Sequence, residues 1–450
     1  MPEKKLMFSN KDLCRLILPM IMEQMLAVLV GLADTIMVAC VGEAAVASVS
    51  LVDNINILLI GVFAALATGG AVVAGQFLGH GDRNKACKAG EQLIIFMAGF
   101  SLVIMLLLYA CKWFVLHVVF GQIESQVMKY ADTYLMIVTA SIPFIALYNC
   151  GAALFRVQGN SMVSMLVSLL MNAVNVAGNA ILILGFHCGV EGVAIPTLVS
   201  RMVAAVIIIM LLRRQSLVIH LSRPFRFRPD WNMIRRILQI GIPNGVENSM
   251  FQLGKLVLLS LISSFGTVAI TANAVGNSVA AFAILPGQSI GMALVTVVSQ
   301  CVGAGDYKQV RYYTKKLHVI TYAAMTLTNG IIVAVIPLIS FAYQLSEETA
   351  AMAAQILLFH SICAIIIWPL SFTLPNTLRA ASDAKYTMTV SLLSMWFCRI
   401  VLGFLFGKYM GMGLFGVWVA MIFDWCVRSI FFMVRYLHGK WEQREIFETL

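Results

Sequence analysis

The sequence predicts an all-α polytopic membrane protein, with twelve transmembrane helices in two pseudo-symmetric six-helix lobes. Of its 450 residues, 60% are hydrophobic and 12% are charged, and the mean hydropathy is +0.89. Soluble domains carry about 25% charged residues, so this composition excludes a soluble enzyme, a disordered chain and a disulfide scaffold. Two further observations support the fold class: long apolar runs recur along the whole chain, and the two halves of the chain resemble each other.

The apolar runs place the helices. A run of about 20 apolar residues crosses the hydrocarbon core of a bilayer as a helix. The first run is too long for the core of a signal peptide and lacks a clear cleavage site, so it is counted as a helix. Twelve helices are expected, near residues 13–38, 48–77, 92–111, 130–154, 162–186, 190–212, 236–263, 270–299, 318–342, 350–374, 386–407 and 413–436.

The basic residues predict the orientation. With the N-terminus inside, 24 of the 31 Lys and Arg residues fall in cytoplasmic segments, and only Lys112, Lys129 and Lys408 fall in outer loops. Lys and Arg gather on the cytoplasmic side of membrane proteins, so both termini are expected there. The basic stretch from Arg213 to Arg236 is then a topological anchor near anionic lipid, and not a nucleic-acid-binding segment.

No motif for an enzyme or a metal site is found. The ten cysteines are scattered without a C-x-x-C pair, and we interpret them as reduced packing residues. The chain lacks a Walker lysine motif, H-E-x-x-H and G-x-S-x-G. Neither ATP chemistry nor hydrolysis is therefore expected.

An internal repeat relates the two halves, because segments 223 or 224 residues apart match in residue type. Six helices in each half is an even number, so both halves have the same topology. Two parallel repeats of this kind enclose a cleft near the midplane in alternating-access transporters. The matched positions are Pro19 with Pro243, Glu23 with Glu247, Arg156 with Arg379, and the turn Gln76-x-x-Gly79-x-Gly81-Asp82 with Gln300-x-x-Gly303-x-Gly305-Asp306.

The repeat gives the expected domain organisation. Residues 1–212 form the N-terminal six-helix lobe, and residues 213–235 form a basic cytoplasmic linker. The C-terminal six-helix lobe covers residues 236–436, and residues 437–450 form a cytoplasmic tail.

Several motifs in a fixed order point to a family. They are Leu18-Pro19 with Ala33-Asp34-Thr35-Ile36-Met37, the run Val41-Gly42-Glu43-Ala44-Ala45-Val46-Ala47, the twice-used Gln-x-x-Gly-x-Gly-Asp turn, Leu154-Phe155-Arg156-x-x-Gly159-Asn160, and Asn172-x-x-Asn175-x-x-x-Asn179. The chain resembles the bacterial type of the multidrug and toxin extrusion (MATE) family, within the multidrug/oligosaccharidyl-lipid/polysaccharide flippase superfamily. The likeness spans nearly the whole chain. It implies a cation-coupled efflux antiporter of the bacterial inner membrane, whose two lobes rock about a central cavity.

Asp34 is the first candidate ion-coupling residue. It lies deep in the expected helix 13–38, where an ionisable side chain is costly unless it is paired, hydrated or protonated. Such a carboxylate can exchange a proton or hold Na⁺, and the alternative is a carboxylate fixed by hydrogen bonds within the fold. In the family the matching Asp couples the cation.

Three asparagines form a polar stripe on the expected helix 162–186. Asn172, Asn175 and Asn179 are spaced i, i+3, i+7, so they share a face and serve either the site or hydrogen bonding between helices. The resemblance places Asn175, Asn179 and Thr197 around Asp34. Many bacterial relatives have a second Asp at the position of Asn179. With one carboxylate fewer, H⁺ is favoured over Na⁺ as the coupling ion.

The C-terminal half departs from the sodium-coupled branch of the family, since residues 350–374 contain no acidic residue. Glu247 and Lys255 lie on roughly one face of the expected helix 236–263. Glu247 is either a second proton or cation site or a residue near the cytoplasmic mouth. Lys255 either pairs with an acid, such as Glu247 or Asp53, or contacts the substrate.

Four further residues have local roles. Pro19 and Pro243 each remove a backbone hydrogen bond and bend their helices, either as hinges or as fixed kinks. Asp424 is spaced i, i+4 from Arg428, so the two are expected to neutralise each other.

The predicted function is therefore multidrug efflux coupled to H⁺ or, less favoured, Na⁺, with no other cofactor and no metal besides Na⁺ at Asp34. The expected partners are small-molecule drugs or metabolites and the lipid bilayer, and the chain is expected to be a monomer. One alternative keeps the fold and transports a lipid-linked oligosaccharide, which requires a cavity rich in Lys and Arg. Another alternative, from a different class, is a passive channel or an intramembrane enzyme.

Overall fold

The computed structural model of the chain describes residues 6–121, 124–222 and 228–442, and all regular structure within them is helical. Contacts divide the chain into two compact units. One is Cys14–Gly245, and the other combines Met1–Leu13 with Val246–Leu450. Parts of the expected linker (223–227) and of the expected tail (443–450) lie outside the described residues.

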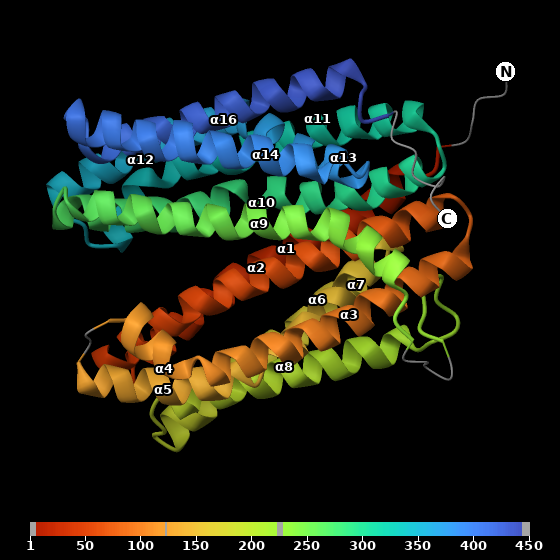
Figure 1. The fold of residues 1–450 in the computed structure, drawn as a ribbon. Coiled ribbons are helices and arrows are strands. Elements are labelled where there is room, and N and C mark those ends of the chain that lie inside the picture. Colours follow the sequence, from red (N-terminus) through yellow and green to blue (C-terminus); the bar gives the residue numbers. More distant parts are fainter. Residues whose placement is uncertain (1–5, 122–123, 223–227, 443–450) are drawn as a thin grey trace. The chain divides into compact units, whose positions relative to one another are not determined.

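The unit Cys14–Gly245 is a helical bundle in which α2 packs against α3, α5 and α6, and α8 packs against α6 and α7 (Figure 1). Its elements are α1 (Asn10–Ala39), α2 (Glu43–Gly79), α3 (Arg83–Ala110), α4 (Lys112–Phe114), η1 (Val115–Val119), α5 (Ser125–Thr139), α6 (Ile142–Val157), α7 (Ser161–Asn179), η2 (Ala180–Gly185), α8 (Glu191–Leu212) and the first half of α9 (Trp231–Ser263). The η segments are π-helical turns.

The unit that contains Val246–Leu450 is a second bundle, in which α10 packs against α11, α12 and α13. After the second half of α9, its elements are α10 (Thr267–Gly303), α11 (Tyr307–Ala342), α12 (Glu347–Ile366), η3 (Pro369–Thr373), α13 (Leu374–Ala380), α14 (Ala384–Ser394), η4 (Met395–Val401), α15 (Leu402–Phe404), η5 (Leu405–Tyr409) and α16 (Gly413–His438).

The division between the units falls inside α9, between Gly245 and Val246, and not in the basic linker 213–235. Close packing explains why the first half of α9 belongs with the N-terminal unit. A Cβ atom on Gly69 of α2 would lie 2.7 Å from the backbone nitrogen of Gly241, so only glycine allows this approach. A hydrogen bond likewise explains why the first residues of the chain belong with Val246–Leu450. The Tyr313 hydroxyl accepts from the Phe8 amide at 2.8 Å.

The predicted fold class, an all-α polytopic membrane protein, is confirmed. Among the described residues, ten helical spans are long and apolar enough to cross a membrane, and α5 with α6, bent by 46°, make an eleventh. These account for eleven of the twelve expected segments. The remaining segment, 236–263, is helical throughout as α9, but Asn244, Glu247 and Lys255 interrupt its apolar sequence.

The repeat is visible in the helices. Helices α2 and α10 both have 37 residues, and α10 starts 224 positions after α2. The turn after each helix is also shared: Gly81 and Gly305 have positive φ values of 87° and 67°, which glycine tolerates. Asp82 then accepts a hydrogen bond from the Lys85 amide at 3.0 Å and Asp306 from the Gln309 amide at 3.2 Å, so each Asp caps the next helix.

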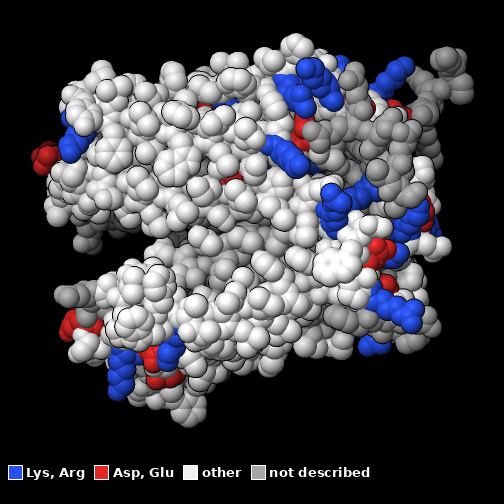
Figure 2. Space-filling view, in the orientation of Figure 1, with Lys and Arg blue, Asp and Glu red and all other residues white. Residues whose placement is uncertain are grey.

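Charged side chains lie mostly near helix ends. Figure 2 shows this for one face, where most Lys, Arg, Asp and Glu side chains lie toward the ends of the helices and few lie between them. On α3, Arg83, Lys85 and Lys88 follow the shared turn, and on α11 Lys308 and Arg311 do so. This distribution is typical of helices that cross a bilayer.

Candidate functional site

Asp34 meets the asparagine stripe inside the unit Cys14–Gly245. It lies in the second half of α1, and Asn175 and Asn179 lie one turn apart near the end of α7, so both amides face the same neighbour. The Asn179 amide nitrogen donates to Asp34 Oδ1 at 2.9 Å. Asn179 is fully buried and Asp34 is half-buried, so this charge-assisted bond is partly buried.

Asn175 lies between Asp34 and Thr197. Both ends of its amide are satisfied when the nitrogen donates to Asp34 Oδ1 (2.9 Å) and Oδ2 (3.2 Å) and the oxygen accepts from the Thr197 hydroxyl at 3.1 Å. The structure thus joins Asp34, Asn175, Asn179 and Thr197 in one hydrogen-bonded cluster, which draws on α1, α7 and α8.

Two further charged residues lie close to this cluster. Asp53 of α2 and Arg201 of α8 both act on the charge of Asp34 through space. Asp53 accepts hydrogen bonds from the Tyr134 hydroxyl and from the Asn56 amide, each at 3.2 Å, and Arg201 donates to the Ser141 hydroxyl at 2.8 Å. Asp53 and Arg201 were not predicted to lie at the site, although an ionisable residue inside an apolar run is itself a signal.

The cluster offers a single carboxylate, and the direct contacts of that carboxylate are the amide nitrogens of Asn175 and Asn179. The Asn179 side-chain oxygen is buried and has no hydrogen-bond partner among the described residues, so it can accept from water or contact a cation. In the same residues no group of three or more His, Cys, Asp or Glu side chains is placed to hold a metal ion. A cation at this site would therefore rest on one carboxylate with amide and hydroxyl oxygens, and a proton needs the carboxylate alone.

Asn172 stands apart from the cluster. It lies on α7 and is half-buried, and its amide nitrogen is buried without a hydrogen-bond partner among the described residues. The stripe predicted from the spacing therefore splits. Two of its members bind Asp34, and the third does not contact it through any hydrogen bond in this part of the chain.

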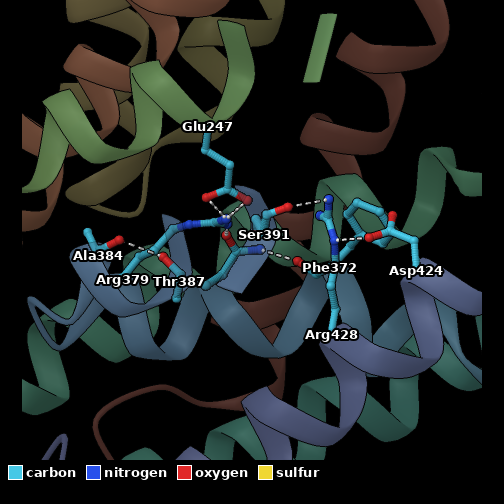
Figure 3. Close-up of polar contacts among 9 residues, drawn as sticks. Glu247, Phe372, Arg379, Ala384, Thr387, Ser391, Asp424 and Arg428 are labelled. Carbon is cyan, nitrogen blue, oxygen red and sulfur yellow. Dashed lines mark hydrogen bonds and ion pairs between the residues drawn. The ribbon is translucent and has the colours of Figure 1, made fainter. Parts of the chain in front are cut away.

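Glu247 lies in the other unit and is paired. The Arg379 guanidinium donates to both carboxylate oxygens, at 2.7 and 2.8 Å, and Figure 3 shows the two side chains facing each other. Both side chains are largely buried. The equivalent residues of the first half, Glu23 and Arg156, form the same ion pair, which the Tyr148 and Ser164 hydroxyls extend. An ion pair repeated in both halves favours a structural role for Glu247.

Lys255 does not reach Glu247, whose carboxylate is held by Arg379. Its ammonium group lies 5.0 Å from the centroid of the Phe251 ring, one turn earlier on α9. The Arg399 guanidinium packs against the same ring, also at 5.0 Å. Lys255 therefore belongs to a group of cations around an aromatic ring.

The predicted pair of Asp424 and Arg428 is confirmed. Arg428 Nε donates to Asp424 Oδ1 at 3.0 Å, as Figure 3 shows, and both side chains are buried. Asp424 also lies 3.9 Å from Arg399, so it faces two arginines.

Pro19 and Pro243 lie inside α1 and α9 as expected. A proline leaves the carbonyl four residues earlier without its helical donor. For Pro19 that carbonyl belongs to Arg15, and the Ser161 hydroxyl lies within hydrogen-bond distance of it (3.0 Å) and of the Leu16 carbonyl (2.7 Å). Ser161 thus places a hydroxyl donor at the carbonyl that Pro19 leaves without its helical partner.

Comparison with known proteins gives the family. The MatE family model matches residues 19–181 and 243–405, two stretches of equal length whose starts are 224 residues apart. The chain is 26% identical over 460 residues to the "Probable multidrug resistance protein NorM" of Thermotoga maritima, covering 99% of this chain and 96% of that protein. It is 27% identical over 442 residues to the "Uncharacterized transporter YisQ" of Bacillus subtilis, covering 95% and 94%.

Solved structures agree on the fold. A crystal structure of "MATE in complex with MaL6" matches with a TM-score of 0.88 at 19% identity, over 96% of this chain and 97% of that one. The outward-facing conformation of "a multidrug resistance MATE family transporter of the MOP superfamily" matches with a TM-score of 0.86 at 19% identity, over 97% of each chain. The chain belongs to the MatE family, which is a family of membrane transporters and not of enzymes.

Proposed function

We propose that this chain is a multidrug efflux antiporter, in which the inward movement of a cation drives the export of amphipathic, often cationic compounds. The observation that carries the proposal is the cluster of Asp34, Asn175, Asn179 and Thr197 inside the apolar bundle. A deep carboxylate is a functional group by default in a membrane protein. The names of similar proteins, such as the "Probable multidrug resistance protein NorM" of Neisseria meningitidis, agree with drugs as the cargo.

H⁺ is the favoured coupling ion. The direct contacts of Asp34 come from two amides, and the position where many relatives have a second carboxylate carries Asn179. A Na⁺ ion gains less from one carboxylate than from two, whereas a proton needs only one. Asp34 can release its proton to the inside and reload from the outside, and no other cofactor is required.

Protonation of Asp34 has a direct structural consequence. The Asn175 and Asn179 amides donate to a charged carboxylate, and neutralising it weakens both charge-assisted bonds between α1 and α7. A ligand that changes the relative stability of two conformations shifts their populations. Proton binding thereby biases the inward-facing and outward-facing states and promotes release of the exported compound.

The proposal places the chain in the bacterial inner membrane as a monomer, with both termini in the cytoplasm. The basic first turns of α3 and α11 support this orientation, because Lys and Arg favour the cytoplasmic side.

Export of ethidium tests the proposal. Cells that express the Asp34→Asn variant at the same membrane abundance as wild type should lose energised ethidium export. Asp132→Asn is the matched control, since Asp132 pairs with Lys112 at the surface, and it should export as wild type does. Unchanged export by Asp34→Asn would reject Asp34 as the coupling residue.

A further inference from the structure

Three basic side chains meet around one aromatic ring in the unit that contains Val246–Leu450. Lys255 from α9, Arg399 from η4 and Arg428 from α16 lie 5.0, 5.0 and 5.8 Å from the centroid of the Phe251 ring. We call these three residues the basic cluster. From the sequence, Lys255 was expected to pair with an acid or to contact the substrate, and Arg428 was expected to pair with Asp424.

The basic cluster lies far from the helix ends. Lys255 is about two turns before the end of α9, and Arg399 is near the middle of the span Ala384–Tyr409. Arg428 lies in the middle of α16. Cations at this depth are costly, so each needs a counter-charge or a polar ligand.

Among the described residues, one carboxylate forms ion pairs within this group of three cations. Asp424 is fully buried, binds Arg428 at 3.0 Å and lies 3.9 Å from Arg399. The nearby Glu247 is held by Arg379 (Figure 3). Lys255 forms no ion pair or hydrogen bond within the described part of the chain, so positive charge remains in excess.

Two residues of the basic cluster differ in their exposure. Lys255 is exposed, whereas Arg399 is only 8% exposed. Arg399 Nε is buried without a hydrogen-bond partner among the described residues. A buried donor without a partner is costly, and a guanidinium matches the oxygens of a carboxylate or phosphate. The cluster therefore lacks acceptor oxygens that carry negative charge.

We propose that the basic cluster binds a carboxylate or phosphate group of the transported compound, with Lys255 making the first contact and Arg399 holding the anion from beneath. This inference rests on the proposed function and narrows its cargo to amphiphiles that carry such a group, zwitterions included. A lipid headgroup has the same chemistry and is the second source of the anion.

Two nearly identical dyes test the proposal. Rhodamine B carries a free carboxylate on a cationic ring system, and its ethyl ester lacks the carboxylate charge. Binding is measured by fluorescence anisotropy with the full chain in phosphatidylcholine nanodiscs. Wild type should bind rhodamine B about tenfold more tightly than the ester, the scale of one charge-assisted hydrogen bond.

The variants separate charge from packing. Lys255→Gln and Arg399→Gln should each remove the preference for the carboxylate, with affinity for the ester unchanged. Arg399→Lys keeps the charge and should retain part of the preference, so it guards against misfolding of Arg399→Gln. Lys408→Gln, at the end of the same span as Arg399, is the matched control and should bind both dyes as wild type does.

The possible results of the binding and export measurements lead to different conclusions. If added phosphatidylglycerol abolishes the preference, the cluster binds anions and a lipid phosphate competes for it. Equal binding of dye and ester by wild type, or an unchanged preference in Lys255→Gln, would overturn the proposal. Ethidium export that depends on Asp34 without any carboxylate preference would reject the anion site and keep the proposed function. A carboxylate preference without Asp34-dependent export would keep the anion site and reject the proposed function.

Discussion

Arg379 Nη2 donates to both carboxylate oxygens of Glu247, and this ion pair is the repeat counterpart of the one between Arg156 and Glu23. In each half the Glu follows the helix proline by one turn. The Arg comes from a neighbouring helix, α6 in the first half and α13 in the second. Each pair thus joins the proline-containing helix to its own bundle one turn after the proline.

Glu247→Gln should lower the free energy of unfolding by about 3 kcal/mol, because it leaves the Arg379 guanidinium buried without its counter-charge. Thermal unfolding in detergent measures the loss. Lys85→Gln is the control, since Lys85 forms an exposed pair with Asp82 and should cost at most about 1 kcal/mol. If Glu247 were instead a second coupling site, the variant would keep wild-type stability and lose ion-driven export.

Asn179→Asp should make transport depend on Na⁺. The substitution adds a second carboxylate beside Asp34, and two carboxylates bind Na⁺ better than one carboxylate and an amide. Ethidium export is compared with and without NaCl at constant ionic strength. Asn172→Asp is the matched control, as it adds the same charge to the same helix without a hydrogen bond to Asp34. A Na⁺ response in both variants, or in neither, would contradict the assigned geometry.

Ser161→Ala should lower the free energy of unfolding by about 1 kcal/mol, because the Arg15 carbonyl at the Pro19 bend loses its hydroxyl donor. Ser263→Ala is the control, since that exposed hydroxyl only bonds its own helix, to Ser260. Both variants are compared with wild type by thermal unfolding. Equal stability of the two variants would show that Ser161 does not support the bend.

The ion pair of Asp230 with Lys88 should make the stability of the fold depend on pH. It lies just before α9, and its hydrogen bond with Lys88 lowers the pKa of the carboxyl below 3.8. A carboxyl whose pKa is lower in the folded state stabilises the fold above its unfolded pKa and loses this effect as the pH falls. Lys88 is half exposed, so Asp230→Asn should cost less than about 1 kcal/mol at pH 7. The difference from wild type in thermal unfolding should shrink below about pH 4, and a constant difference would contradict the assignment.

Much of the fold could be predicted from the sequence, because apolar runs and the residues that start and end helices are local features of the chain. The repeat of the turn at Asp82 and Asp306 predicted two equivalent halves, and both turns cap a helix as their composition requires. The division inside α9 was not predictable in this way. It depends on the close approach of Gly69 and Gly241, which lie far apart in the sequence.

The candidate site was partly predictable. Asn175 and Asn179 share a face by their spacing, and the family resemblance placed them near Asp34. Arg201 and Asp53 were missed, since through-space effects on a carboxylate depend on how α2 and α8 pack. The recurrence of both Glu23 and Arg156 in the second half did contain a signal for the ion pair of Glu247 with Arg379.

Proton coupling at Asp34 is tested by measuring the proton movement that the exported compound causes. Proteoliposomes with an acidic interior and a trapped pH-sensitive dye receive ethidium, with and without Na⁺, for wild type and Asp34→Asn. With wild type the interior should become more alkaline, independently of Na⁺, and Asp34→Asn should give no response. Equal alkalinisation by Asp34→Asn, or a wild-type response only with an imposed Na⁺ gradient, would contradict proton coupling at Asp34.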